Sequence, residues 1–373
     1  MRKDYHVIST ILGSMLIVLL LAGCGDQRIL EKLGFMQANS FDLAENGQLE
    51  VAITMPKAEQ KTSAQRVVLS TKARTGKEAR MKLTREINLQ IVSGQLRNSL
   101  FGMSLARNGL LKHLDTYQRD PSISPRVKLT IVRGSAKKML EQSYIQHPII
   151  SRYIEGLLQK EAAGRSIPVS TVYTFIRDYY DDGIDPVMAV LRNKDNNIII
   201  DGVALFHDDR YVAEIPADDG LVFSFLRGSF KQGDLSIHLN EGGANGGDTV
   251  MLTSIVSNRK VKVKRGAGGK PELTIKVSLK GTVIEYTGDH SITQPTEKRL
   301  LEKGMEKALN GRGDRLISLM QKNNADGLGL GISVRSHSSY REWKKMKWPE
   351  MYPSVKAKCV FSIEILNAGK IVE

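Results

Sequence analysis

The stretch Val250–Glu285, VMLTSIVSNRKVKVKRGAGGKPELTIKVSLKGTVIE, contains two long runs in which apolar and polar residues alternate, on either side of the glycine-rich segment Gly266–Gly269. Alternation with a period of two places apolar side chains on one face of a β-strand and polar side chains on the other. Glycines between two such runs are typical of a turn. The sequence therefore predicts a pair of long strands over 250–264 and 272–285.

The segments that follow this pair predict a helix packed on the sheet. Pro295–Asn323 carries apolar residues at helical spacing on both sides of Gly311–Gly313, so we expect a long core helix, with a kink at the glycines as an open alternative. Val355–Ile365 alternates again and predicts a final strand. Cys359 falls on the apolar face of that strand, so we expect a small buried residue rather than a reactive thiol. The C-terminal part is thus predicted to be a sheet wrapped on a long helix.

Upstream of this region, strand and helix patterns alternate along the chain. The patterns predict strands near 49–55, 67–71, 100–105 and 127–131, and helices over 77–91, 109–117, 136–143, 149–161 and 171–180. They also predict a hairpin over 198–215, a short buried helix over 221–226, a strand near 332–335 and a basic helix over 339–348. This order favours an α+β (mixed α/β), multi-domain fold.

The turn formers of Asp181–Pro186 favour a domain boundary between that run and Asn197. A chain of 373 residues is long enough to bury at least two hydrophobic cores. We therefore expect an N-terminal region over 24–197, with two subdomains as an open alternative, and a C-terminal domain over 198–373.

The first residues have the pattern of an export signal. Arg2 and Lys3 precede an apolar stretch, Val7–Leu20, that has the length of a secretory core rather than of a membrane span. Leu21-Ala22-Gly23-Cys24 follows directly and matches the bacterial lipobox. The sequence predicts a signal peptide over 1–23 and lipid modification of the Cys24 thiol, which would fix the chain to the outer face of a membrane. An ordinary signal peptide with an incidental cysteine is the alternative.

The charge of the chain is strongly basic, with 54 Lys and Arg against 40 Asp and Glu and a net charge of +14. Removal of residues 1–23 takes two basic residues and one acidic residue and leaves +13. Nucleic acid, an anionic membrane surface and an acidic protein are the partner classes that such a charge favours. Export disfavours nucleic acid. Two cysteines, Cys24 and Cys359, exclude a disulfide scaffold and a cysteine-rich metal module.

Two basic segments are candidates for a partner or membrane surface. Lys260, Lys262 and Lys264 alternate with valines and therefore share the polar face of one strand. Such a stripe is either a docking surface or the solvated face of a strand that avoids aggregation. Trp343 and Trp348 lie among lysines, where they would either dip into a bilayer interface or pack onto the terminal sheet.

Catalytic signatures are absent from the sequence. It contains no HExxH, no G-x-S-x-G and no Walker A motif, and Gly327–Gly331 has neither the spacing nor the following helix expected of a dinucleotide loop. Asp181, Asp182 and Asp185 are interpreted as turn formers rather than calcium ligands. We expect no catalytic residue, no cofactor and no metal.

Several motifs together resemble the Ger(x)C family, the lipoprotein C subunits of nutrient germinant receptors in spore-forming bacteria. The motifs are Gly23-Cys24-Gly25-Asp26 with Ile29–Leu33, Leu114-Asp115 with Arg119-Asp120-Pro121, Asp201–Phe206 leading to Phe225–Gly228, and Trp343–Trp348 before Asn367-Ala368-Gly369. Gly25 stands where the family usually has tryptophan. The resemblance covers nearly the whole chain after the leader.

The resemblance implies three mixed α/β domains and a non-enzymatic role. The chain would be a subunit on the outer side of the spore inner membrane, would work with two integral-membrane subunits, and would help to assemble the receptor that responds to nutrients. Lipidation of Cys24 is the functional position that the resemblance transfers. A solute-binding lipoprotein with a cleft between two lobes, and an anchored hydrolase with a deep polar pocket, are the alternatives.

Overall fold

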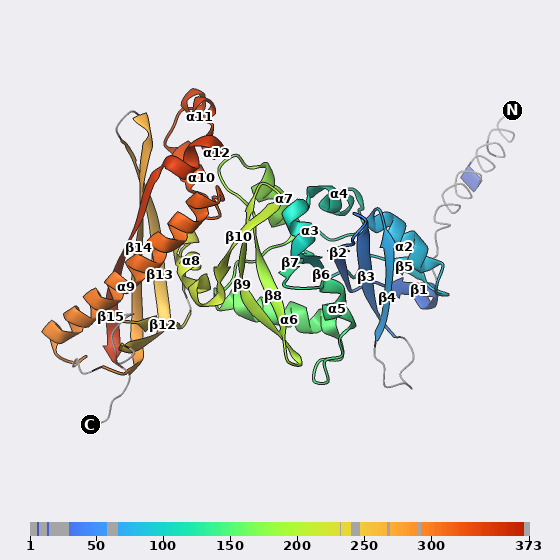
Figure 1. Cartoon of the computed structure of the whole chain (residues 1–373), viewed down its shortest axis with the longest axis horizontal. Helices are drawn as coiled ribbons and strands as arrows, with labels where there is room; N and C mark the ends of the chain where they lie inside the picture. Colours follow the sequence, from blue (N-terminus) through green and yellow to red (C-terminus); the bar gives the residue numbers. More distant parts are fainter. Residues whose placement is uncertain are drawn as a thin grey trace.

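The computed structural model describes residues 6, 13–14, 30–57, 66–231, 233–239, 247–266, 269–288 and 292–368. The molecule is elongated, with one sheet and its helices toward the N-terminal end and a second sheet at the C-terminal end (Figure 1). Helices and strands are mixed in both parts. The predicted α+β, multi-domain fold is confirmed.

The first sheet has eight strands in the order β10-β9-β8-β7-β6-β2-β3-β4. Its strands are β2 (Ala38–Leu43), β3 (Leu49–Pro56), β4 (Arg66–Ala73), β6 (Asn98–Gly102), β7 (Lys128–Val132), β8 (Val187–Lys194), β9 (Asn197–His207) and β10 (Arg210–Pro216). The four central strands run parallel, and antiparallel strands flank them on both sides. A short parallel pair, β1 (Leu33–Phe35) and β5 (Gln90–Val92), lies apart from this sheet.

Helices cover both faces of the eight-stranded sheet. One core contains residues of α2 (Gly76–Thr84), α3 (Met103–Asn108), α4 (Leu111–Arg119) and α7 (Val172–Tyr180). The other contains residues of α5 (Ala136–Glu141), α6 (Ile150–Ala163) and α8 (Gly220–Arg227). Adjacent residues of one strand enter different cores, as Leu100 and Phe101 do. Central strands buried on both faces are the expected result of parallel pairing.

The predicted division at Asn197 falls inside this sheet. Asn197 begins β9, which pairs antiparallel with β8 from Lys194↔Asn197 to Val187↔Leu205. The two predicted regions therefore share one sheet across the division, and the change to the second sheet comes after α8.

The second sheet has five strands and packs against the longest helix. Its strands are β11 (Phe230–Lys231), β12 (Leu235–His238), β13 (Thr249–Arg265), β14 (Pro271–Tyr286) and β15 (Lys356–Ala368), and the helix is α9 (Pro295–Lys322). β13 and β14 form the predicted hairpin, and β15 joins β14 in parallel. α9 runs through Gly311–Gly313 without a break, and Gly313 lies against Cys359. The prediction of a sheet wrapped on a long helix is confirmed.

The strand expected near 100–105 ends at Gly102, where α3 begins, and two other predicted segments form a different element in the structure. The helix expected over 77–91 ends at Thr84, because Gln90–Val92 pairs with β1. The strand expected at 332–335 is a helix, α10 (Leu330–Ser336), with Leu330 and Val334 buried one turn apart. In both places three or four apolar residues fit either period, and tertiary packing decides.

Short helices complete the chain. They are η1 (Leu30–Lys32), η2 (Ala217–Asp219), α11 (Tyr340–Met346), α12 (Trp348–Met351) and η4 (Tyr352–Ser354). The basic helix predicted over 339–348 is therefore split. Lys347 adopts a left-handed conformation between α11 and α12.

Candidate functional site

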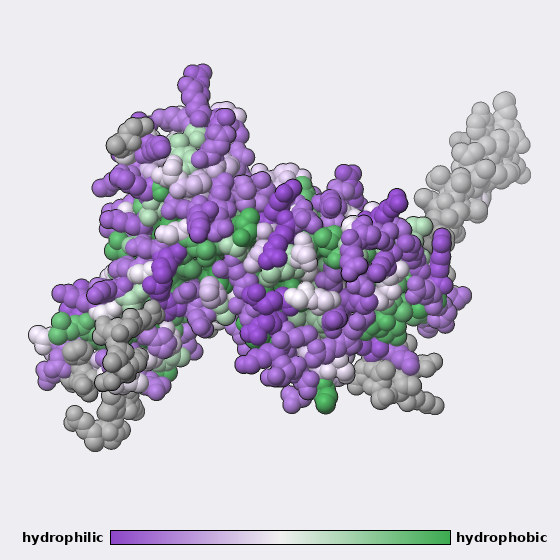
Figure 2. Space-filling model, in the orientation of Figure 1, coloured by the Kyte–Doolittle hydropathy of each residue, from purple (hydrophilic) through white to green (hydrophobic). Residues whose placement is uncertain are grey.

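Cys24, the predicted lipidation position, lies outside the described residues, as does most of the apolar stretch 7–20. Among the residues that the structure does describe, no helix is both long and apolar enough to cross a bilayer. In the view of Figure 2 hydrophilic residues cover most of the surface. Lipidation and the signal peptide stay predictions.

The three lysines of the predicted stripe lie where the alternation places them. Lys260, Lys262 and Lys264 are exposed on β13, while the residues that alternate with them, Val261 and Val263, pack against the core. This face of the sheet is opposite the face that packs on α8 and α9. The structure therefore places the three charges on one open surface.

Trp343 and Trp348 do not form a surface, and this part of the predicted site is corrected. Their exposed fractions are 4% and 3%. The two rings stack with centroids 6.1 Å apart, and Trp348 also contacts Tyr352. The indole nitrogen of Trp348 donates to Asp326 at 3.0 Å. Because both rings are core residues, neither is available to a bilayer or a partner.

The residues around Trp348 belong to a polar junction between the two sheets. Asp326, between α9 and α10, is buried, and its carboxylate accepts from the backbone amides of Leu330 and Gly331 at 2.9 and 2.8 Å. With the indole of Trp348 as a third donor, the carboxylate is well satisfied. Burial outweighs these bonds and raises the pKa of Asp326 to about 7.

Asp185 joins the first sheet to this junction. One carboxylate oxygen accepts from the amide of Asp326 at 2.7 Å, and the other accepts from the amide of Asp208 at 3.0 Å. The backbone amide of Asp185 donates in turn to the carbonyl of Asp326. Burial raises the pKa of Asp185 above its ordinary value. The pairing ties the loop before β8 to the loop after α9.

Two further acids of the same turn bind the C-terminal helices. Asp181 accepts two hydrogen bonds of 2.9 Å from the guanidinium of Arg335 on α10. Asp182 forms an ion pair of 2.8 Å with Lys344 on α11. The interpretation of Asp181, Asp182 and Asp185 as turn formers described their effect on the backbone. It missed their hydrogen bonds and ion pairs with the C-terminal part of the chain. The spacing of the acids carries no signal for partners that lie some 150 residues later, so only the fold could reveal them.

Glycines bring these two segments into backbone contact. Gly183 lies so close to α10 that an added Cβ would sit 2.7 Å from the backbone nitrogen of Ile332. The Ile332 amide donates to the carbonyl of Gly183 at 3.1 Å. Gly331, in the segment expected to be only a turn, precedes this contact in α10. The sequence was expected to have no helix after Gly327–Gly331, but α10 begins at Leu330 within this segment. Its first turn packs against Gly183.

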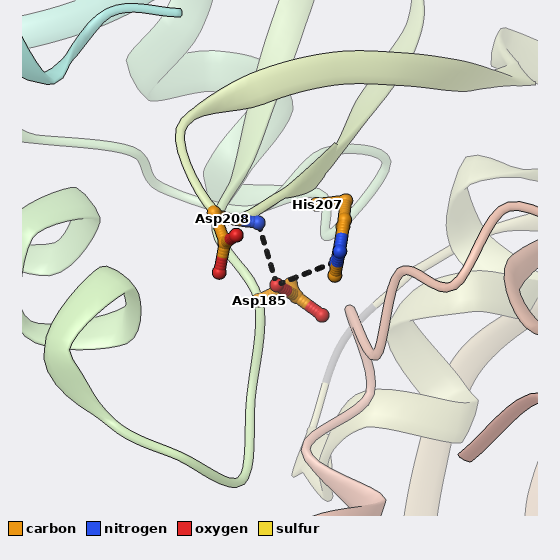
Figure 3. Close-up of side chains that lie close together, drawn as sticks. All are labelled: Asp185, His207 and Asp208. Atoms are coloured by element: carbon orange, nitrogen blue, oxygen red, sulfur yellow. Dashed lines mark hydrogen bonds and ion pairs between the residues drawn. The ribbon is translucent and has the colours of Figure 1, made fainter. Parts of the chain in front are cut away.

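His207 and Asp208, at the turn between β9 and β10, complete a small cluster with Asp185 (Figure 3). One potential ligand atom from each of the three residues lies within 4.8 Å of the others. Nδ1 of His207 is 4.0 Å from the Asp185 carboxylate. Both oxygens of that carboxylate already accept hydrogen bonds from backbone amides, so Asp185 stabilises the loops that it joins. The expectation of no metal stays a prediction.

Pockets occur within the two parts of the molecule. One of about 360 Å³ is lined by residues of β2, β3, α2 and α4, among them Phe41 and Val51, and by the Arg80–Asp120 ion pair. Another of about 450 Å³ lies between β12 and α9. Burial lowers the pKa of His113, which lines the first pocket, to about 4. His113 is thus a neutral imidazole in the pocket wall, and its buried Nε2 forms no hydrogen bond with any residue that the structure describes.

Comparison with protein families decides the assignment. Residues 26–193 match the family model described as spore germination protein N-terminal domain, and residues 201–369 match the one described as spore germination B3/GerAC like, C-terminal. The chain belongs to the Ger(x)C family. The two matches together cover most of the sequence, and their division lies close to the turn between β8 and β9.

Individual relatives extend over the whole length. The spore germination protein GerQC of Bacillus cereus is 24% identical over 355 residues, covering 95% of this chain and 97% of that protein. The putative spore germination protein YfkR of Bacillus subtilis (strain 168) is 22% identical, with 95% of each chain covered. The crystal structure of the GerBC protein has a similar fold, with a TM-score of 0.53 and 18% identity over 91% of this chain and all of that one. The family role is therefore that of a spore germination protein of the germinant-receptor C-subunit type.

Proposed function

We propose that the chain is a membrane-anchored lipoprotein subunit of a nutrient germinant receptor, with a non-catalytic role in assembly or signalling. Family membership supports a part in spore germination. The lipobox sequence Leu21–Cys24 supports the anchor. In this proposal Cys24 carries the lipid, and the folded body lies on the outer face of the spore inner membrane beside two integral-membrane subunits.

The junction formed by Asp181, Asp182, Asp185 and Asp326 supports a role in assembly rather than in catalysis. Its acids are occupied by backbone amides and by basic side chains of α10 and α11, so they hold the two sheets together. Carboxylates engaged in this way stabilise the fold and are not free to act as a general acid, general base or nucleophile. This arrangement is the observation that carries the non-catalytic part of the proposal.

The solute-binding alternative predicts a cleft between two lobes. The pockets described above instead lie within one sheet and its helices each. At the place where the two sheets meet, Asp185 and Asp326 bind each other's loops. The structure therefore favours the receptor subunit over a transporter lipoprotein.

The test replaces Cys24 with alanine in the chromosomal gene. We expect spores of the Cys24→Ala strain to respond poorly to nutrients while still germinating with calcium dipicolinate, which bypasses the receptors. The fraction of germinated spores is measured by loss of optical density. A normal nutrient response, in spores whose protein is shown to lack lipid, would contradict the proposal.

Cys359→Ala provides the matched control. Cys359 is buried at 4% exposure, and burial raises the pKa of its thiol, so it is not a modification site. The control strain should keep both the lipid, detected by metabolic labelling, and the nutrient response.

A further inference from the structure

The open face of the second sheet carries far more lysine than the stripe on β13. Strand pairing aligns the exposed residues in rows across β13, β14 and β15: one row is Lys262, Thr274 and Lys358, and the next is Lys260, Lys276 and Val360. Lys231 and Lys280 both flank Val256 in another row. The lysine face, as we call this surface, contains Lys231, Lys260, Lys262, Lys264, Lys276, Lys280, Lys356 and Lys358.

Few acids compensate these charges. On the same face, Glu364 pairs with Lys280 at 2.6 Å and Glu272 pairs with Lys356 at 3.3 Å. The other six lysines form no ion pair with any residue that the structure describes. Lys260 and Lys276 are direct cross-strand neighbours, an arrangement of like charges that destabilises a sheet. The lysine face therefore carries positive charge that the acids on the same face do not neutralise.

Protection of strand edges does not account for the pattern. Lysine on an edge strand prevents a sheet from pairing with other chains, and this explanation fits Lys262 and Lys264. Lys276 and Lys280 lie on β14, which is paired on both sides by β13 and β15. A central strand has no open edge to protect, so attraction to an anion outside the chain is the better explanation for Lys276 and Lys280.

We propose that the lysine face docks on the anionic surface of a lipid bilayer. The charges are spread over four strands of an open sheet, as a continuous layer of phosphates would require, whereas an acidic protein would need carboxylates matched to single lysines. Val256 and Val360 stand among the lysines with 40% and 39% of their surface exposed and add apolar contact at the headgroup level.

The position of the face fits this occupant. The described residues from Leu30 onward begin with η1 and β1 at one end of the elongated molecule, and the second sheet lies at the other end (Figure 1). An anchor that precedes η1 and a lysine face on β13–β15 would hold the molecule to the bilayer at both ends. This step rests on the membrane attachment proposed above, and it adds a second contact that needs no lipid modification.

The test measures how binding depends on lipid charge. The full chain carrying Cys24→Ala, and thus no lipid, is floated with vesicles of phosphatidylcholine alone and of phosphatidylcholine mixed with phosphatidylglycerol. The leader carries Arg2 and Lys3 and also prefers anionic lipid, so the lysine face is measured by comparing the ratio of the two bound fractions with that of variants that keep the leader unchanged. We expect binding to the anionic vesicles to be higher, and to fall when NaCl is raised from about 0.1 to about 0.5 M.

Variants locate the contact on the molecule. Lys260→Glu with Lys262→Glu and Lys264→Glu should reduce the binding ratio about tenfold or more, since each lysine near an anionic surface contributes to attraction. The triple glutamine variant at the same positions provides a second test if the glutamate variant does not fold. The control reverses three exposed lysines of α9, Lys303, Lys307 and Lys322, which lie away from the lysine face and should leave the ratio unchanged.

Two results would overturn the proposal. Equal binding of the parent chain to both kinds of vesicle would exclude anionic lipid and favour an acidic protein instead. Equal loss of binding in the test and control variants would assign the effect to net charge rather than to this face. Neither result touches the germination test of Cys24, so failure of the docking surface is distinguishable from failure of the receptor role.

Discussion

The backbone amide of Phe361 on β15 donates a 2.8 Å hydrogen bond to the side-chain oxygen of Asn310 on α9. Three acids at the same helical spacing do likewise: Glu302, Glu306 and Asp314 accept from the amides of Ile365, Ile363 and Cys359 at 3.0, 3.1 and 3.0 Å. Acceptor side chains spaced four residues apart on α9 thus form hydrogen bonds with backbone amides spaced two residues apart on β15. The helix thereby satisfies the outer edge of the sheet, which would otherwise expose unpaired backbone.

Removal of one of these acceptors should cost stability. Asn310→Ala leaves the Phe361 amide without its partner beside a buried ring, and we expect a loss of about 1–3 kcal/mol in the free energy of unfolding. Urea unfolding followed by circular dichroism measures it. Lys303→Ala on the exposed side of α9 is the control and should change stability by about 0.5 kcal/mol or less. Equal effects of the two would show that the edge bond is unimportant.

Backbone contact at Gly183 leads to a second prediction. Gly183→Ala places a methyl group against the backbone of Ile332 and should lower the free energy of unfolding by about 1–3 kcal/mol. Gly156→Ala, in α6 with nothing within 4 Å of the added carbon, should instead stabilise by about 0.5–1 kcal/mol. Denaturant midpoints of the two variants should therefore move in opposite directions, and a shared direction would contradict the close approach.

The buried carboxylate of Asp326 predicts a pH dependence. Its pKa is raised from 3.8 to about 7, so the folded state binds a proton that the unfolded state has already lost. Its contribution to stability is therefore largest at pH values below 3.8 and is lost as the pH rises toward about 7. Asp326→Asn should flatten the fall in unfolding free energy between pH 4.5 and pH 7.5, relative to the parent chain. Parallel pH curves for the two proteins would show that Asp326 does not titrate in this range.

The ion pair of Asp181 with Arg335 predicts a modest coupling. Asp181→Ala, Arg335→Ala and the double variant form a cycle, and we expect a coupling energy of about 1 kcal/mol or less because the guanidinium is partly solvated. Lys77 and Asp120, whose charged atoms are 4.0 Å apart with the lysine well exposed, serve as a weaker reference pair. A coupling no larger than that of the reference would mean that the two-bond geometry adds nothing.

Prediction from the sequence succeeded where one period dominates a long segment. The hairpin of β13 and β14, the helix α9 and the buried position of Cys359 follow from many apolar residues in a single pattern. It failed at Ile332–Arg335, where few residues fit both periods. It also treated the two tryptophans as possible surface residues, because their lysine neighbours hide the fact that α11 and α12 pack inward.

The candidate site was predictable in part for the same reason. Alternation placed Lys260, Lys262 and Lys264 on one face from neighbouring residues alone. Lys276 and Lys358 join them only through strand register, and the junction of Asp185 with Asp326 depends on loops that are 141 residues apart. Contacts of that range are set by topology and leave no local pattern.

The pairing of β8 with β9 also bears on how such proteins diversify. Recombination between two relatives at residue 197 would join an N-terminal segment from one parent to a C-terminal segment from the other. The hybrid would have to preserve the pairs from Val187↔Leu205 to Lys194↔Asn197, together with the bulge between Val190 and Leu191. Parents whose β8 and β9 do not match would produce a hybrid with faulty strand pairing in the middle of the sheet. We therefore expect the two family segments to be inherited as a unit.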